Sequence, residues 1–176
     1  MKKRITHTDE YLMQALFLLL EEKPFTAITI KELVTKAGVN RSTYYRSFHS
    51  KEDIVGSFYI KLLKSCVSYH AGEDLATHLY NIFTKFLQHK KQLLSLHRNQ
   101  LTPQLFTALH SLFVEYRICD TTSAHHETYA LYYHMGGIFH TLMLWLDQDM
   151  RPSVSFMVEE SLRILPENFK PVLSQN

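Results

Sequence analysis

One short run, Arg41-Ser42-Thr43-Tyr44-Tyr45, carries side chains that are suited to contacting duplex DNA. An arginine guanidinium can donate two hydrogen bonds to guanine O6 and N7, and a threonine methyl group can contact the methyl group of thymine. A tyrosine ring packs while its hydroxyl group binds a phosphate. The run predicts base contacts by Arg41, Ser42 and Thr43 and phosphate contacts by the tyrosines. Two alternatives stay open: an ordinary polar helix start, and a Tyr44 that only packs.

Residues on both sides of this run could bind the phosphate backbone. Thr29 and Lys31 stand at the expected start of a preceding helix, where the helix dipole favours an anion. Lys51 stands at the expected start of the following helix and offers a backbone amide and an ammonium group. His49 lies just before it. We expect these four residues to hold the protein on DNA without reading its sequence.

Helical patterns surround the run and would position it. Residues 8–22 carry apolar side chains at helical spacing. Thr29 with Glu32 three residues later is the pattern of a capping box, and Gly38 is a natural left-handed residue to end that helix. A further short helix is expected from about residue 41 to residue 48. Two helices joined by a short turn that contains glycine are typical of a helix-turn-helix DNA reader.

The same segment resembles the DNA-binding domain of the tetracycline-repressor (TetR) family. The resemblance extends over about residues 8–60 and is carried by Thr29-Ile30-Lys31-Glu32-Leu33, by Ala37-Gly38-Val39 and by the run from Ser42 to Ile54. It implies a transcription regulator, by family likeness a repressor, with a three-helix reading head, an all-helical C-terminal body and a dimer formed by the last two long helices. Ser47 and His49 depart from the usual family residues and put individual phosphate contacts in doubt.

The rest of the chain predicts more helices. It has only five Gly and five Pro, and its apolar stripes keep helical spacing to about residue 165. We expect an all-α fold of about nine helices. Among them are a long helix over about 124–147 and a last helix opened by Pro152. The expected domains are a DNA-binding domain over 1–50 and a dimerisation and effector domain over 51–176, joined by the helix that starts near residue 51.

A dimer interface is expected in the last two helices. Two adjacent glycines in the middle of a helix cost about 1 kcal/mol each relative to alanine unless something approaches closely. An apolar stripe on the last helix has little sequence left to cover it. These features predict a homodimer seam at Gly136, Gly137, Val154, Met157, Val158, Leu162 and Leu165. A ligand against the bare glycine backbone is the alternative.

Large aromatic residues recur on stripes of the body helices and could line an effector site. An apolar or aromatic ligand would suit such a lining. The expected lining residues are Phe83, Phe86, Phe113, Tyr116, Tyr133, Met135 and Phe139. The alternative is that the rings fill a solid core. In that case the body could bind a partner protein instead, which would make the chain an adaptor or co-activator.

Charge and composition narrow the class of protein. Residues 1–51 contain nine Lys and Arg against five Asp and Glu, and the remainder contains ten against twelve. A basic first third suggests that only this part meets a polyanion. The family resemblance and the expected dimer imply that this polyanion is a double-stranded, pseudo-palindromic DNA operator. We find no pattern for catalysis, a metal or a cofactor, and no apolar run as long as a membrane span. Two isolated cysteines, Cys66 and Cys119, predict reduced thiols in a cytoplasmic protein.

Overall fold

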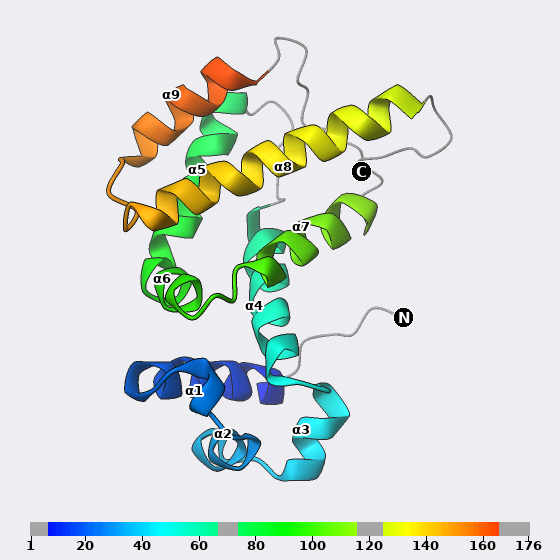
Figure 1. Cartoon of the computed structure of the whole chain (residues 1–176), viewed down its shortest axis with the longest axis vertical. Coiled ribbons are helices and arrows are strands. Elements are labelled where there is room, and N and C mark those ends of the chain that lie inside the picture. The colour runs from blue at the N-terminus through cyan, green and yellow to red at the C-terminus, as the bar shows by residue number, and fades with distance from the viewer. Residues whose placement is uncertain (1–6, 67–73, 116–124, 166–176) are drawn as a thin grey trace.

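The computed structural model describes residues 7–66, 74–115 and 125–165. These residues form nine α-helices and one short 3-10 helix, with no strand among them, which confirms the all-α expectation. Three helices form a head at one end of the molecule, α4 runs from the head into the body, and the other helices form the body (Figure 1). None of the described helices is long and apolar enough to cross a membrane.

The head consists of α1 (His7–Glu22), the 3-10 helix η1 (Phe25–Ala27), α2 (Ile30–Ala37) and α3 (Arg41–Ser47). Its helix starts follow the local signals of the sequence. The Thr29 hydroxyl accepts a hydrogen bond from the Glu32 N–H at 3.2 Å, and the Glu32 carboxylate accepts one from the Thr29 N–H at 2.9 Å. This is the expected capping box. Apolar side chains from the three helices and from Ile28, which follows η1, close the core of the head: Leu12, Leu16, Ile28, Leu33 and Tyr44.

Helix α4 (Lys51–Cys66) joins the head to the body. It packs against α1 on one side and against α7 on the other. The rings of Phe17 in α1 and Phe58 in α4 meet edge to face with centroids 5.0 Å apart. Ile54, Val55 and Tyr59 are buried along the same helix. A continuous buried face means that the direction of α4 is set by both parts of the protein.

The body contains α5 (Leu75–Gln88), α6 (Lys90–Arg98), α7 (Pro103–Glu115), α8 (His125–Asp147) and α9 (Val154–Ile164). Phe83 and Trp145 meet edge to face with ring centroids 5.5 Å apart and join α5 to α8. The expectation that Pro152 opens the last helix is wrong. Ser153 is the N-cap, and its hydroxyl accepts the Phe156 N–H at 3.2 Å, while the Pro152 carbonyl accepts the Trp145 indole N–H at 3.0 Å.

Candidate DNA-binding interface

Helices α2 and α3 are joined by a tight turn at Gly38. This glycine has φ 67° and ψ 29°, a left-handed conformation that residues with a Cβ atom rarely adopt. Its N–H donates to the Thr35 carbonyl, and the Val39 N–H donates to the Val34 carbonyl at 3.0 Å. The turn closes the C-terminal end of α2 and starts α3 after only three residues. The two helices therefore form a helix-turn-helix.

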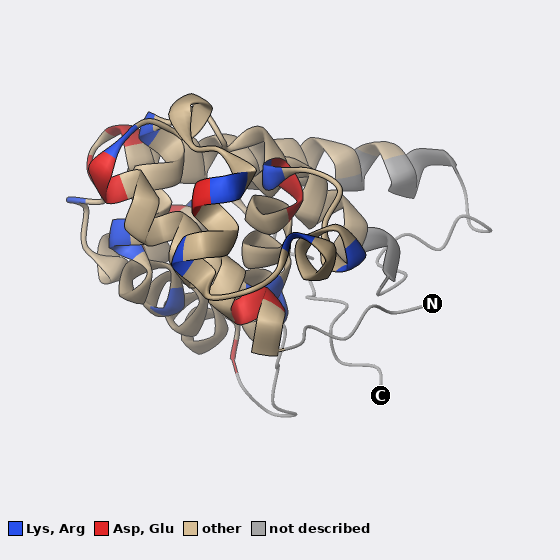
Figure 2. Ribbon diagram, turned by 90° about the horizontal axis from the view of Figure 1, so that it is seen from below, with Lys and Arg blue, Asp and Glu red and all other residues tan. Residues whose placement is uncertain are grey.

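Helix α3 presents a polar face to solvent at the end of the head. Arg41, Ser42 and Arg46 are exposed, Thr43 is partly buried, and Tyr45 is 50% exposed. Lys31 lies exposed in the first turn of α2. Figure 2 views the molecule from this end and shows Lys and Arg spread over it, some of them beside Asp or Glu. The expected base-contacting residues thus share an accessible helix.

Three cations on this end are exposed to solvent and accessible to an anion. Within the residues that the structure describes, no ion pair engages Lys31, Arg41 or Arg46. Other head lysines are already paired: Lys23 with Glu32, and Lys36 with Glu22 at 2.8 Å. Arg46 was not among the DNA-binding residues expected from the sequence. Its position three residues after Thr43, on the same helix face, was the signal that could have found it.

Lys51 has a different environment from the one expected. Its ammonium group donates to the Phe25 carbonyl at 2.9 Å and to the Ile28 carbonyl at 2.6 Å. It also lies 4.5 Å from the centroid of the Phe25 ring. These contacts tie the start of α4 to the segment before α2. They occupy two of the three N–H donors of the ammonium group, so we propose a structural role for it in place of the expected phosphate contact.

Thr29 is likewise occupied inside the head. Its hydroxyl donates to the Glu32 carboxylate at 2.7 Å, in addition to the capping bond it accepts. The Lys23 ammonium, followed by the Thr29 N–H and hydroxyl groups, lowers the pKa of Glu32 to about 2. Thr29 therefore stabilises the start of α2, and a phosphate would have to compete with a carboxylate for its hydroxyl group.

Tyr44 is buried, in contrast to the phosphate contact expected for it. Its ring is 0% exposed and meets the Tyr45 ring edge to face with centroids 5.1 Å apart. The hydroxyl has no hydrogen-bond partner among the described residues, and burial raises the pKa of Tyr44 to about 12. Consecutive residues of a helix point about 100° apart, so Tyr44 can face the core while Tyr45 is 50% exposed and accessible to DNA. The alternative that Tyr44 packs agrees with this structure.

His49 is exposed beside the N-terminal end of α4, where a phosphate could reach it. Its N–H and that of Ser50 donate to the Asp53 carboxylate at 2.8 and 3.0 Å, and the Ser50 hydroxyl accepts the Asp53 N–H at 3.2 Å. Partial burial raises the pKa of Asp53, but the two backbone donors outweigh it and the net pKa is lowered. Ser50 and Asp53 together cap α4.

The residues expected around an effector do not come together as the lining of one site in the part of the chain that the structure describes. Phe83, Phe86 and Met135 are buried, and Phe139 is half-buried against Phe106 with ring centroids 5.2 Å apart. Tyr133 is 80% exposed and cannot line an enclosed site in this protomer. The Phe113 side chain and Tyr116 lie outside the described residues. The three buried residues fit the solid-core alternative.

The expected dimer residues divide into covered and open ones. Met157 and Val158 are buried, because α9 packs against α5 of the same chain, so these two are corrected to core residues. Val154 and Leu165 are partly buried, and Leu162 is 39% exposed. A Cβ atom added to Gly136 or Gly137 would meet nothing within 4 Å. Exposed apolar residues that were not expected at the seam extend this surface: Leu144, Phe156 and Ile164.

The fold and the turn at Gly38 place the head in the class of helix-turn-helix DNA-binding domains. Residues 12–57, from within α1 to within α4, match the protein family described as bacterial regulatory proteins, tetR family. This match supports a DNA-binding transcriptional regulator whose residues 12–57 are similar to that family. A comparison with curated proteins found no significant relative.

Proposed function

We propose that the protein is a homodimeric repressor that binds a pseudo-palindromic operator with two heads and leaves it when an effector binds the body. The observation that carries the proposal is the helix-turn-helix with Lys31, Arg41 and Arg46 on its exposed side, none of them in an ion pair with another described residue. Two heads would enter successive major grooves about 34–36 Å apart. We assign DNA binding to residues 1–50 and dimerisation and effector binding to residues 51–176.

The DNA contacts follow from which side chains are free. Arg41, Ser42 and Thr43 start α3, where recognition helices meet base edges, and we assign them to base contacts. Lys31, Tyr45 and Arg46 are assigned to phosphates, because each is exposed and none is needed for the core of the head. His49 is a weaker phosphate contact.

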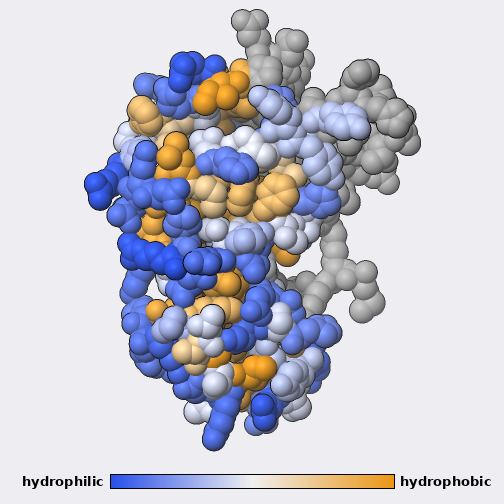
Figure 3. Space-filling view, viewed as in Figure 1, coloured by the Kyte–Doolittle hydropathy of each residue, from blue (hydrophilic) through white to orange (hydrophobic). Residues whose placement is uncertain are grey.

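The exposed side of α8 supports the homodimer. Tyr133, Gly137 and Leu144 stand at i, i+4 and i+11, which places them on one side of the helix, and all three are exposed. Figure 3 shows hydrophobic atoms over the part of the molecule that α8 and α9 occupy in Figure 1. A second copy laid on this side would bury the apolar side chains and would explain glycines that leave open space in one protomer.

An adaptor that recruits another protein is the second candidate function. Tyr129 is 77% exposed and Tyr132 is 47% exposed near the start of α8, and exposed aromatic groups are frequent in protein interfaces. A protein that binds this end of α8 in place of a small effector would leave the DNA-binding head unchanged.

The salt dependence of binding to duplex DNA tests the DNA-binding assignment. Each phosphate that the protein neutralises contributes nearly one unit to the steepness of the slope of the logarithm of affinity against the logarithm of salt concentration. Loss of a phosphate contact therefore removes nearly one unit. We expect a variant with alanine at Lys31, Arg41 and Arg46 to lose about two units of slope, one for each of the phosphate contacts Lys31 and Arg46, while it keeps its melting temperature. A triple variant with the wild-type slope would contradict the assignment.

A further inference from the structure

Three consecutive residues at the end of α6, His97, Arg98 and Asn99, reach two different parts of the protein. The Asn99 side-chain oxygen accepts the Phe25 N–H of the head at 2.9 Å. His97 Nε2 lies 2.7 Å from the Asp147 carboxylate at the end of α8, and Arg98 Nη2 donates to Asp149 at 3.0 Å. Figure 1 shows α6 between α1 of the head and the turn that joins α8 to α9.

The contact with the head involves a group that the head itself holds firmly. The Asn99 amide is oriented by a second hydrogen bond, from its nitrogen to the Ser95 carbonyl at 2.9 Å. The Phe25 side chain is buried, and its carbonyl accepts the Lys51 ammonium. Asn99 is thereby connected through Phe25 to the residue that begins α4, directly after the recognition helix. Movement of the end of α6 would be transmitted through Phe25 to the start of α4, which follows α3.

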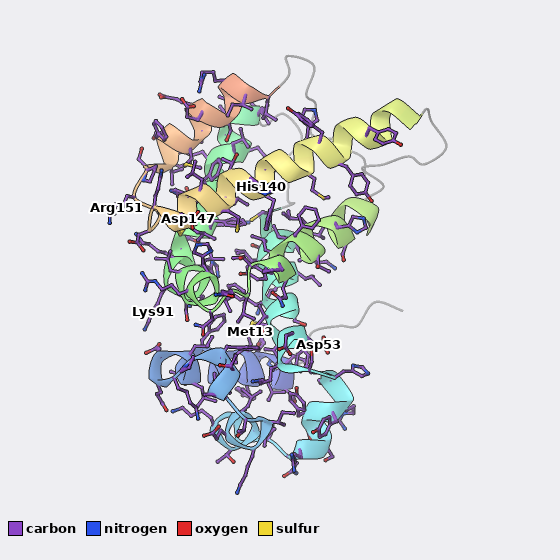
Figure 4. All side chains as sticks on the ribbon, in the orientation of Figure 1. Met13, Asp53, Lys91, His140, Asp147 and Arg151 are labelled. Carbon is purple, nitrogen blue, oxygen red and sulfur yellow. The ribbon has the colours of Figure 1, made fainter. Side chains whose placement is uncertain are left out.

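The contact with the body involves a turn of unusual backbone conformation. Asp149 and Met150 have φ values of 53° and 51°, although neither is glycine. Such residues cost free energy and persist only where the surroundings hold them. Here the Met150 N–H donates to the Trp145 carbonyl at 2.8 Å, and Asp149 is held by Arg98 and Arg151. Figure 4 labels Asp147 and Arg151 at this turn and Lys91 on α6 nearer the head.

We propose that His97, Arg98 and Asn99 are positioning residues that fix the orientation of the DNA-binding head relative to the α8–α9 turn. The inference rests on the proposed dimer, because α8 and α9 there define the position of each protomer relative to its partner. If the seam and the heads are linked through α6, these residues set the distance between the two heads. They would determine which spacing of operator half-sites the dimer accepts, without touching DNA.

The test uses the full-length protein and a duplex recovered from a random DNA pool by the wild type. Further duplexes carry one or two base pairs inserted between the half-sites, and one contains a single half-site. We expect Asn99→Ala to bind the recovered duplex at least about 5-fold more weakly. Its preference for the recovered duplex over the duplexes with inserted base pairs should become smaller, while its affinity for the single half-site stays unchanged.

Three further variants separate positioning from a general loss of stability. Asn99→Asp keeps an acceptor for the Phe25 N–H and should restore the spacing preference. Asp147→Asn weakens the partner of His97 at the other end of α6 and should narrow the preference as Asn99→Ala does. Lys91→Ala removes an exposed ion pair with Glu21 at 2.7 Å, across the same α1–α6 contact, and should behave as the wild type.

The outcomes also separate this inference from the proposed function. A wild-type protein that is a monomer, or that shows no spacing preference, overturns the dimeric repressor and the positioning role with it. A wild-type preference that Asn99→Ala and Asp147→Asn retain overturns the positioning role alone. Equal losses on the single half-site and on the full duplex also overturn it, because they report damage to the head itself.

Discussion

Lys51 and Phe25 are joined twice: the lysine ammonium donates to the phenylalanine carbonyl at 2.9 Å and lies 4.5 Å from the centroid of its ring. The residues are far apart in sequence, yet the contact fixes α4 against the segment that leads into α2. A basic residue at the edge of a DNA-binding head is thus used for the architecture of the head.

Replacement of Lys51 by methionine should lower stability and leave the electrostatics of DNA binding unchanged. Met retains the apolar stem but removes the Lys51 donor from the Ile28 carbonyl and one of two donors from the Phe25 carbonyl, which also accepts the Ile28 N–H at 3.2 Å. We expect the free energy of unfolding to fall by about 1–3 kcal/mol. The slope of affinity against salt should stay as in the wild type. Chemical denaturation and DNA titration at several salt concentrations measure the two effects.

Lys31→Met is the matched control for this change. Lys31 is exposed and has no ion-pair partner among the described residues, so its loss should reduce the salt slope by about one unit without affecting unfolding. If Lys51→Met reduced the slope while Lys31→Met lowered the stability, the assigned roles of the two lysines would be reversed.

Tyr44 and Tyr45 should respond to substitution in opposite ways. Tyr44→Ala removes a fully buried ring and should cost about 3–5 kcal/mol of stability. Tyr44→Phe removes only a buried hydroxyl that has no described partner, and should be neutral or slightly stabilising. Tyr45→Phe should keep the melting temperature and weaken binding to all DNA sequences alike. A marked loss of stability in Tyr44→Phe would show that its hydroxyl group has a partner.

The Lys23 ammonium and the capping-box donors of Thr29, which together lower the pKa of Glu32, predict how the head responds to acid. Glu32 has a pKa of about 2, against 4.5 for an unperturbed glutamate. A carboxyl group whose pKa is depressed by folding contributes stability in full above its unfolded pKa and loses it as the pH falls toward its folded pKa. The contribution of Glu32 should therefore disappear between about pH 4.5 and about pH 2.

Glu32→Gln isolates this effect, because glutamine can still complete a capping box but carries no charge. The melting temperature of the wild type should exceed that of the variant above about pH 5, and the gap should close as the pH is lowered. Melting curves measured across this range provide the check. A gap that stays constant down to about pH 2 would contradict the assigned cause.

Local sequence patterns predicted the fold well because the residues that form each pattern lie within a few positions of one another in the sequence. The capping box at Thr29 and Glu32 and the turn at Gly38 both formed as their spacing indicates. The resemblance to the tetR family located the head, and the family match at residues 12–57 confirms it.

Contacts between distant segments could not be predicted in this way. Lys51 was expected to face DNA, because nothing near it in sequence shows that two carbonyls more than twenty residues earlier would accept its ammonium group. Met157 and Val158 were expected at a dimer seam, because the sequence does not show that α5 would cover them. The side on which Tyr44 lies depends on the packing of α3, which composition alone does not define.

The exposed side of α8 should hold the dimer together. Leu144 is 57% exposed, and a Glu at this position would place a charge in the proposed seam. We expect Leu144→Glu to sediment as a folded monomer. Leu18→Glu is the matched control, since Leu18 is also exposed, at 49%, but lies on α1 of the head, and this variant should remain a dimer. If Leu144→Glu sediments as a dimer, the dimer interface does not include this side of α8.

Selection of duplexes from a random DNA pool, with the wild type and Arg41→Ala in parallel, tests the reading role of α3 most directly. The wild type should enrich a pseudo-palindrome whose half-sites lie about one helical turn, or a multiple of it, apart. Arg41→Ala should enrich the same sequence with relaxed preference at one base pair in each half-site, equivalent to about 1–3 kcal/mol of lost discrimination. Identical enriched sequences for both proteins, or no enrichment by the wild type, would contradict the proposal that Arg41 in α3 reads the operator.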